Sequence, residues 1–312
     1  MKSNKIIQFS FLLTAMVGFS LAGCNKDKLN QGSTDITTMQ QLTTDEINVE
    51  NAMNDAATDA DATMSFRGNQ KSTGGGLPCN ATIDSTSILH DSITLFITYD
   101  GLNCNGTRNR TGKIEIKKAV HTHWGQAGAT VRYKFINYTV TRVSTGKSIT
   151  LNGTKTFQNV TGGFVWQLGF GVTSIIHRIT GAMQTTFDDG TIRTWNIARQ
   201  VTYSGAHNHM MMTIDGLGSV GEYNNLITWG TSRNNEIFYT QITQSVKHKE
   251  LCGGDPVSGI TIHQIPSENK SATITFGYDN NNQPVTGDEC PTKYRLDWQR
   301  NGNSGTKYVL LP

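Results

Sequence analysis

From about residue 79 onward, apolar and polar residues alternate along the chain. Residues 164–172 place Phe, Trp, Leu, Phe and Val at every second position, and residues 131–140 alternate with a change of phase near Phe135. Successive side chains of a strand point to opposite faces, so this period predicts half-buried β-strands, and the phase change predicts a bulge. Turn-forming Gly, Asn and Asp separate the runs. We therefore predict an all-β fold for residues 79–312, a large antiparallel meander that forms a twisted sheet or a sandwich.

The pattern before residue 79 is different. Residues 43–66 carry a weak apolar stripe at helical spacing, and Thr43 with Glu46 forms a capping-box pattern. We predict one short helix here, packed lightly on the β domain with its acidic residues on a solvated face; a calcium or partner site is the alternative for that face. The polar residues 24–42 predict a tether, and residues 67–78, with three successive glycines, predict a linker.

Residues 1–23 have the pattern of an export signal. A basic start precedes an apolar run that ends in Leu-Ala-Gly, directly before Cys24. The run is shorter than the ~20 apolar residues that span a bilayer. The motif resembles the lipobox of bacterial lipoproteins. This resemblance implies that Cys24 carries diacylglycerol and that the mature chain is anchored in the cell outer membrane, on its periplasmic or its cell-surface side.

Four further cysteines remain in the mature chain. They are Cys79, Cys104, Cys252 and Cys290. An even number in an exported chain favours disulfides, and four cysteines allow three pairings. A zinc site is the functional alternative, although the sequence contains no Cys-x-x-Cys.

Two similar strand-like segments lie near the two cysteine pairs. Residues 92–100 and 272–279 are both rich in Thr and both end in Tyr-Asp, and each has one cysteine before it and one after it. This similarity favours local pairing, Cys79 with Cys104 and Cys252 with Cys290. It also suggests two similar units, at 79–118 and 252–300, although chance similarity among Thr-rich strands explains the pattern equally well.

Charge and motifs exclude several classes of function. The formal net charge falls from +3 to +1 when Lys2 and Lys5 leave with the export signal. A near-neutral chain lacks the basic stripe of a dedicated nucleic-acid binder. Nucleophile elbows, phosphate loops and His-Glu-x-x-His are also missing from the sequence. We therefore predict no cofactor. Whether the protein is an enzyme stays open at this point, and the sequence favours a protein without enzymatic activity.

Two His-x-His segments are the best candidates for metal ligands. They contain His121 and His123, and His207 and His209. In a strand, positions i and i+2 share a face, so each pair would present two imidazoles to one metal ion. Exposed histidines without a metal are the plainer interpretation. An Asn- and Asp-rich loop at 279–289 is a weaker candidate for calcium, with an ordinary turn as the alternative.

The five tryptophans offer a second kind of binding chemistry. They are Trp124, Trp166, Trp195, Trp229 and Trp298. Several exposed tryptophans would form a platform that stacks on sugar rings, whereas buried ones would be cross-strand packing partners. An open groove lined by two or more tryptophans with carboxylates nearby would favour a carbohydrate ligand.

The mature chain also resembles a family of uncharacterised secreted lipoproteins of the Bacteroidota. Three features carry the resemblance: the acidic helix after the lipid cysteine, a first Cys before a strand, and the segment 99–114. This segment reads Tyr-Asp-Gly, then Cys-x-Gly, two arginines and Gly-x-Ile. A second Cys pair lies near the C-terminus. The resemblance supports the architecture and brings no activity with it.

We therefore expect a membrane-anchored lipoprotein with a β-rich structural or binding domain. Its partners would be the membrane, through the lipid anchor, and a glycan or protein ligand. The alternative is a carbohydrate-binding or carbohydrate-active protein, with or without the assistance of a metal ion. The exposure of the tryptophans and the presence of a groove distinguish these functions.

Overall fold

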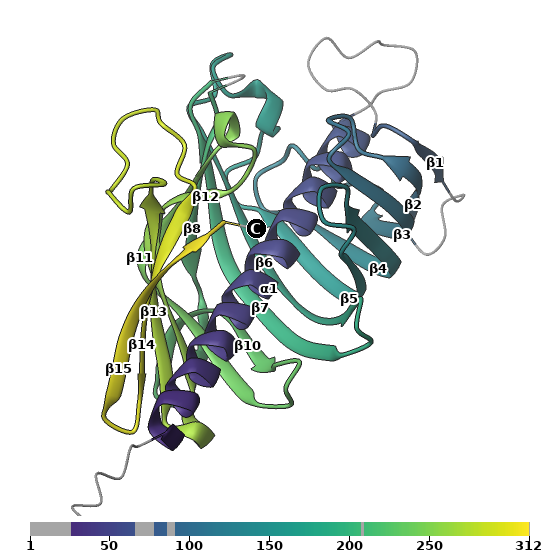
Figure 1. The fold of residues 1–312 in the computed structure, drawn as a ribbon. Helices are drawn as coiled ribbons and strands as arrows, with labels where there is room; N and C mark the ends of the chain where they lie inside the picture. Colours follow the sequence, from purple (N-terminus) through teal and green to yellow (C-terminus); the bar gives the residue numbers. More distant parts are fainter. Residues whose placement is uncertain (1–25, 66–77, 86–90, 207–208, 312) are drawn as a thin grey trace, which may run out of the picture.

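The computed structural model describes residues 26–65, 78–85, 91–206 and 209–311, with the side chains of 26–35 and 65 left aside. One helix, α1 (Lys26–Ser65), precedes a single 15-stranded sheet (Figure 1). The strands are β1 (Ala81–Ser85), β2 (Ser92–Leu102), β3 (Arg108–Ala119), β4 (Ala129–Arg142), β5 (Ser148–Asn159), β6 (Ser174–Phe187), β7 (Ile192–Ser204), β8 (Met211–Gly216), β9 (Gly218–Val220), β10 (Tyr223–Thr231), β11 (Ile237–Lys249), β12 (Pro256–Ile265), β13 (Lys270–Tyr278), β14 (Lys293–Arg300) and β15 (Asn303–Leu310).

The strands follow one another as an antiparallel meander. Neighbours in the sequence pair from β1 to β7 and again from β10 to β15, and β10 pairs with β7. The short strands β8 and β9 lie off this path, because β8 pairs with β7 and β11 while β9 pairs with β10. The predicted all-β meander is confirmed, and it forms one continuous curved sheet.

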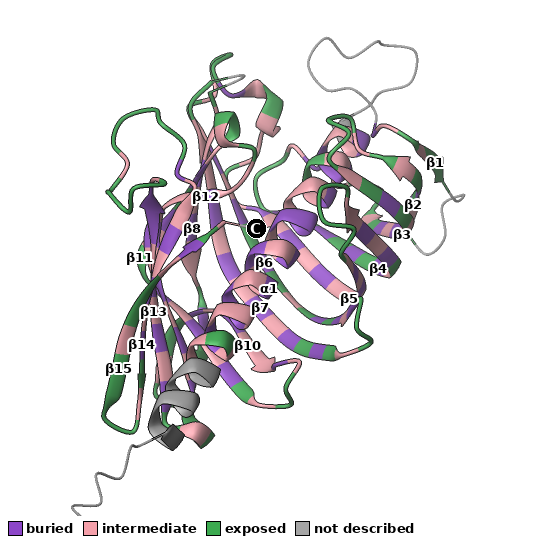
Figure 2. Cartoon of the chain, in the orientation of Figure 1, coloured by how far each residue is buried: buried purple, intermediate pink, exposed green. Residues whose placement is uncertain are grey.

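The sheet curves around α1, which crosses from the β13–β15 end to the β1–β3 end (Figure 1). Buried and exposed residues alternate along the strands, as the bands of colour in Figure 2 show. The buried set forms one core between the concave face of the sheet and α1, with Met39, Met53 and Ala56 contributed by the helix. A helix laid into a curved sheet is therefore the main packing unit of this molecule.

The phase change in β4 is a bulge, as predicted. Tyr133 and Phe135 are buried at odd positions and Tyr138 at an even one, and the pairing with β5 shifts register between Phe135 and Tyr138. Asn137 adopts a left-handed conformation with φ of 47°. Its carbonyl oxygen would lie only 2.1 Å from a Cβ on Gly112 of the neighbouring strand, so that position requires glycine.

The strand predicted for residues 164–172 is wrong. The structure has a 3₁₀ turn at Val165–Gln167, followed by a loop in which Gly169 and Gly171 have φ values of 84° and 88°. These left-handed glycines prevent the extended backbone that the apolar alternation suggested. Trp166 and Phe170 are consequently exposed at the loop surface, at 42% and 72%.

The helix is longer and more deeply buried than the sequence suggested. It begins at Lys26 and spans 40 residues, so the tether predicted for 24–42 is wrong from Lys26 onward. Met39 and Leu42, within the predicted tether, belong to the core. Cys24, the export signal and nearly all of the predicted linker lie outside the described residues.

Two disulfides lie towards the two ends of the sheet. Cys79 joins Cys104 beside β1 and β2, and Cys252 joins Cys290 beside β12 and β14, with Cα–Cα distances of 5.2 and 5.4 Å. These are the local pairings that the sequence favoured. The similarity of the two surrounding units stays a prediction.

Candidate functional site

The acidic face of α1 is not solvated, contrary to our prediction. Each of the five acids between residues 45 and 59 forms an ion pair with an arginine of the sheet or its loops. The pairs are Asp45–Arg233, Glu46–Arg193, Glu50–Arg199, Asp55–Arg108 and Asp59–Arg110. We call this set the arginine ladder. Its arginines are distant from α1 in the sequence, so the pattern of the helix alone gave no sign of them.

The arginines in the middle of the ladder are almost completely buried. Arg193 and Arg199 are only 1% and 2% exposed. Arg193 donates to Glu46 at 2.6 Å, and the hydroxyl of Thr240 donates to the same Glu46 oxygen at 3.0 Å. Charge-assisted hydrogen bonds of this kind compensate the charge of each buried pair, although Arg193 Nε and Nη1 and Arg199 Nε have no hydrogen-bond partner among the described residues. Removing one member of a pair would leave an uncompensated charge.

The pKa values of the ladder acids depend on the balance between burial and arginine. Burial is the largest single influence and raises the pKa of Glu46 and of Glu50. Arg193 and Arg199, together with the other charges and hydrogen bonds around each carboxyl, outweigh it and hold both pKa values below the ordinary range. At Asp45 burial outweighs the hydrogen bond and charge of Arg233, and the pKa rises to about 6. The ladder therefore contains ionised carboxylates in its middle at neutral pH.

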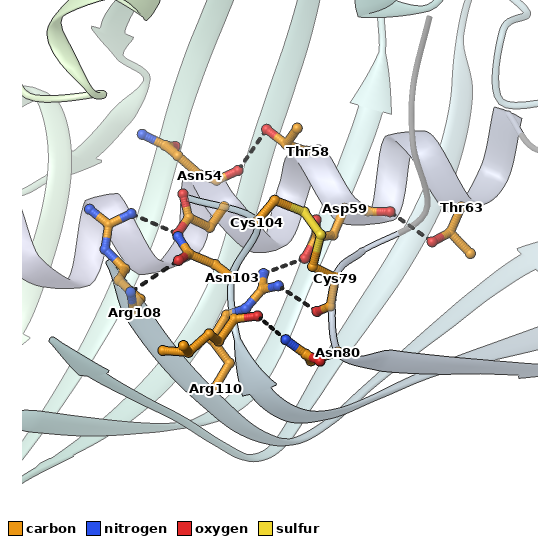
Figure 3. A network of polar contacts seen from close by, with 12 residues as sticks. Asn54, Thr58, Asp59, Thr63, Cys79, Asn80, Asn103, Cys104, Arg108 and Arg110 are labelled. Carbon is orange, nitrogen blue, oxygen red and sulfur yellow. Dashed lines mark hydrogen bonds and ion pairs between the residues drawn. A yellow bond between two sulfur atoms is a disulfide. The ribbon is translucent and has the colours of Figure 1, made fainter. Parts of the chain in front are cut away.

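Near the end of α1, the ladder joins the first disulfide (Figure 3). Arg110 donates to Asp59 at 2.5 Å and to the carbonyl of Cys79 at 3.2 Å. The side-chain oxygen of Asn103, the residue before Cys104, accepts the backbone N–H of Arg108 at 3.0 Å. One arginine thus ties the helix to the disulfide, and this corner of the molecule is held by covalent and ionic contacts together.

Beyond the ladder, an aromatic pocket of about 180 Å³ lies between α1 and the sheet. Five aromatic side chains line it, together with Asp61 and His177. The aromatic residues are Trp124, Tyr133, Phe157, Trp166 and Tyr203. Trp166 is the exposed member, and Trp124, Tyr133 and Phe157 are buried. A concave, mostly apolar pocket with a few polar groups is the usual form of a small-molecule site.

Asn159, at the end of β5, holds the two loops that bring tryptophans to this pocket. Its side-chain nitrogen donates to the carbonyl of Trp124 at 2.9 Å and to that of Gly163 at 2.8 Å. Its side-chain oxygen accepts the N–H of Gly162 at 2.9 Å. Since Asn159 is fully buried, the positions of both loops are fixed from inside the protein.

Asp61 differs from the other acids of α1. Its carboxylate accepts the indole N–H of Trp124 at 2.6 Å, and in the described part of the chain it has no ion-pair partner. It is 8% exposed. Burial raises the pKa of Asp61 to about 6, although the hydrogen bonds from Trp124 and the Val165 backbone act against this.

His177 lies in the same pocket and is neutral at physiological pH. Burial lowers its pKa to about 4. Its ring is 5.0 Å from that of Trp124 and 5.2 Å from that of Tyr203, between centroids. Its Nε2 is buried without a hydrogen-bond partner among the described residues. A buried ring nitrogen of this kind offers a polar contact to a molecule in the pocket.

A larger groove adjoins the aromatic pocket. It has a volume of about 680 Å³, and residues of α1, of the β4–β5 turn and of the segment 248–255 line it. Thr58, Tyr203, Met210 and Glu250 line both the groove and the pocket. The groove and the pocket therefore adjoin at these four residues.

The histidine pairs do not form the predicted arrangement. His121 and His123 are exposed and lie in the turn after β3, so the argument from a shared strand face does not apply to them. His209 is exposed, and His207 lies outside the described residues. Among the described residues, no three His, Cys, Asp or Glu side chains come together as a metal site.

The Asn-rich loop before β14 is an ordinary turn. Asp279 accepts the backbone N–H groups of Asn281 and Gln283, at 2.8 and 2.7 Å. The ammonium of Lys293 donates to Asn280 and Asn282. Oxygens that would bind calcium are thus used within the loop.

The tryptophans do not form an exposed platform. Trp124, Trp195 and Trp298 are buried, Trp229 is half-buried and Trp166 alone of the five is exposed. The aromatic pocket nevertheless combines two tryptophans with two carboxyl groups, those of Asp61 and Glu250. Sequence reasoning missed Asp61, because nothing in the acidic run distinguishes it from its neighbours until Trp124, 63 residues away, is placed beside it.

No protein-family model, curated protein or solved structure matches this chain. Within the described residues, no helix has both the length and the apolar character needed to cross a membrane.

Proposed function

We propose that the protein is a lipid-anchored lipoprotein of the outer membrane whose β domain binds a small ligand in the aromatic pocket. The pocket is the observation that supports binding. Five aromatic side chains, a buried carboxyl and an imidazole nitrogen without a hydrogen-bond partner among the described residues surround one cavity, and a groove adjoins it.

The proposed anchor and the pocket lie at opposite ends of α1. Helix α1 begins two residues after Cys24, and Asp61 is 35 residues further along. At 1.5 Å per residue this separation is roughly 50 Å. A lipid on Cys24 would therefore hold the domain at one end of α1 and present the pocket well away from the anchored end.

The anchor is tested with Cys24→Ala. This variant should incorporate no labelled fatty acid and should move from the membrane to the soluble or unprocessed fraction, because the acceptor thiol is lost. The matched control is the double variant Cys79→Ala with Cys104→Ala, which removes the cysteines of one disulfide together and leaves Cys24 in place. Equal labelling of the Cys24 variant and the unaltered protein would contradict the anchor.

The binding site is tested with a ligand screen on the full mature protein. Tryptophan fluorescence is the readout, since Trp124 and Trp166 both line the pocket. Ligands that change the fluorescence should lose their effect in Trp166→Ala and keep it in Trp229→Ala, whose altered side chain lies outside the pocket. A screen in which no compound class acts through Trp166 would contradict a binding function at this pocket.

A carbohydrate ligand is the second candidate. Two tryptophans with two carboxyl groups in one pocket are the arrangement that would stack on a sugar ring and accept its hydroxyl hydrogens. Neutral mono- and disaccharides belong in the same screen for this reason. A glycan that binds through Trp166 would establish this alternative.

A further inference from the structure

The five ladder acids and Asp61 share one helix but differ in their counter-charges. Every acid from Asp45 to Asp59 has an arginine. Asp61 has the indole of Trp124 and, among the described residues, no cation. Burying a carboxylate without a cation costs free energy, so this position is unfavourable in the protein alone. The missing positive charge is the feature that a ligand would supply.

The walls around Asp61 suit a positive charge as well. Aromatic side chains attract cations through the negative faces of their rings, most strongly Trp, and cages of such rings recognise ammonium groups. The pocket has three such side chains beside the carboxylate, Trp124, Tyr133 and Tyr203, and Phe157 and Trp166 complete the lining. His177 offers no competing charge, because its burial keeps it neutral.

We infer that the aromatic pocket binds an organic cation, a molecule whose ammonium group lies against Asp61 within the cage of Trp124, Tyr133, Phe157, Trp166 and Tyr203. This inference rests on the proposed binding function and names its ligand class. The neutral Nε2 of His177 accepts a hydrogen bond from a primary or secondary ammonium, which would give that buried atom a partner. A quaternary ammonium uses Asp61 and the rings alone.

The size of the cavity agrees with a compact cationic group. Its volume of about 180 Å³ is more than ten times the ~10–15 Å³ that one water molecule needs on the same measure. Glu250 lies at the place where the pocket and the groove meet and is exposed. A second carboxylate at the entrance attracts a positively charged ligand before it reaches Asp61.

The test compares choline with 3,3-dimethylbutan-1-ol, its neutral analogue of the same shape. The protein is the full mature lipoprotein in nanodiscs of phosphatidylglycerol, whose head group carries no amine. Binding is measured by tryptophan fluorescence and calorimetry. We expect choline to bind at least tenfold more tightly than the neutral analogue, and ethanolamine and methylated ethanolamines to bind as well. Equal or tighter binding of the neutral analogue would overturn the inference.

Two variants assign the charge to Asp61. Asp61→Asn keeps a side-chain oxygen for the Trp124 N–H and removes the charge, so choline binding should fall at least tenfold while the neutral analogue is unaffected. Glu250→Gln removes the charge at the entrance and should weaken choline binding less than Asp61→Asn does. The matched control is Glu222→Gln, an exposed carboxylate outside the pocket, which should leave the dissociation constant unchanged. A larger loss in Glu250→Gln than in Asp61→Asn would place the cation elsewhere and overturn the assignment.

A third variant keeps the test decisive if Asp61→Asn does not fold. Trp166 lies exposed on a loop, so Trp166→Ala leaves the core intact and removes one wall of the cage. It should weaken choline binding at least fivefold. Unchanged choline binding in this variant would contradict the cage.

Further ligands separate this inference from the proposed function. Choline and a short-chain phosphatidylcholine share the quaternary ammonium, and their relative affinities tell a free ligand from a lipid head group. Binding of neutral sugars through Trp166 without binding of any cation would overturn the inference and keep the binding function. Failure of every ligand class to act through Trp166 would contradict both.

Discussion

The interface between α1 and the sheet has two parts, the arginine ladder and the surroundings of Asp61, and buried carboxyl groups have different partners in each. From Asp45 to Asp59 the sheet supplies an arginine for each carboxylate, and the helix is fixed in place. At Asp61 the sheet and its loops supply aromatic rings and one indole N–H. In the ladder, each buried negative charge is compensated within the protein. At Asp61 the buried charge has an electrostatic cost, which a cationic ligand would relieve.

The largest expected effect on stability comes from breaking a buried ion pair in the middle of the ladder, Arg199 with Glu50. Arg199→Ala should lower the free energy of unfolding by about 3–5 kcal/mol, because Glu50 is then buried without its cation. Chemical denaturation followed by circular dichroism measures this. The double variant Arg199→Met with Glu50→Leu should recover much of the loss, since it removes both charges together. A double variant as unstable as the single one would show that the charge is not the reason.

The first disulfide should have the next largest effect. Cys79 and Cys104 are 25 residues apart, and the chain-entropy account gives a bridge of this size roughly 3–4 kcal/mol. Replacing both by Ala should lower the melting temperature and keep the β spectrum, because the central strands contain no cysteine. The pair Cys252 and Cys290 is the control at the other end of the sheet. Loss of β structure in either variant would contradict the view that each disulfide stabilises only its own end of the sheet.

At the other part of the interface, removing charge should stabilise the protein. The raised pKa of Asp61 means that its contribution is favourable when it is protonated and is lost as pH rises through about 6. Asp61→Asn should therefore be more stable than the unaltered protein at pH 8, by up to about 3 kcal/mol for a shift of about two pKa units. The difference should shrink as the pH falls from 8 to 5, because a growing share of Asp61 is then protonated.

Thermal melting across this pH range measures the Asp61 effect. The other titratable groups that line the pocket are His177, Tyr133, Tyr203 and Glu250. Burial keeps His177 neutral and raises the pKa of Tyr133 and of Tyr203, so these three do not titrate between pH 5 and 8. Glu250→Gln is the control for the remaining group. A stability gain that is independent of pH would contradict the electrostatic account.

The smallest expected effect on stability is at the rim of the pocket. Trp166→Ala should change the free energy of unfolding by less than about 0.5 kcal/mol, because the side chain is 42% exposed on a loop. Trp124→Ala, by contrast, removes a buried ring and the donor to Asp61, and should be strongly destabilising. Denaturation of both variants checks the contrast. Equal losses would show that Trp166 has a packing role.

The sequence predicted the sheet well because strand pattern and turn chemistry are local. The bulge near Phe135 and the turns rich in Gly, Asn and Asp follow from residues that are close together in the chain. The alternation at 164–172 misled, since Gly169 and Gly171 adopt left-handed conformations that an apolar pattern does not reveal. These glycines were the available signal against a strand there.

The helix and the pocket were harder to predict because their partners are remote in sequence. The polar residues of α1 looked solvated, and only the fold brings Arg193 and Arg199 onto Glu46 and Glu50, almost 150 residues away. The same holds for Asp61. Residues 26–42 looked like a tether because they are mostly polar and show no clear apolar stripe, although Met39 and Leu42 belong to the core.

The position of α1 in the chain has a consequence for the order of folding. The helix is synthesised first, yet its contacts are completed late: Asn51 bonds Asp255, and Gln40 accepts a hydrogen bond from Lys307. Until those residues have been synthesised, the concave face of the sheet is incomplete, and α1 cannot make all of its native contacts with it. Folding that depends on such distant contacts is slow, because the long loops must close before the contacts form. For most of its synthesis the nascent chain therefore has an acidic helix whose partners Arg193, Arg199 and Arg233 have not yet been made.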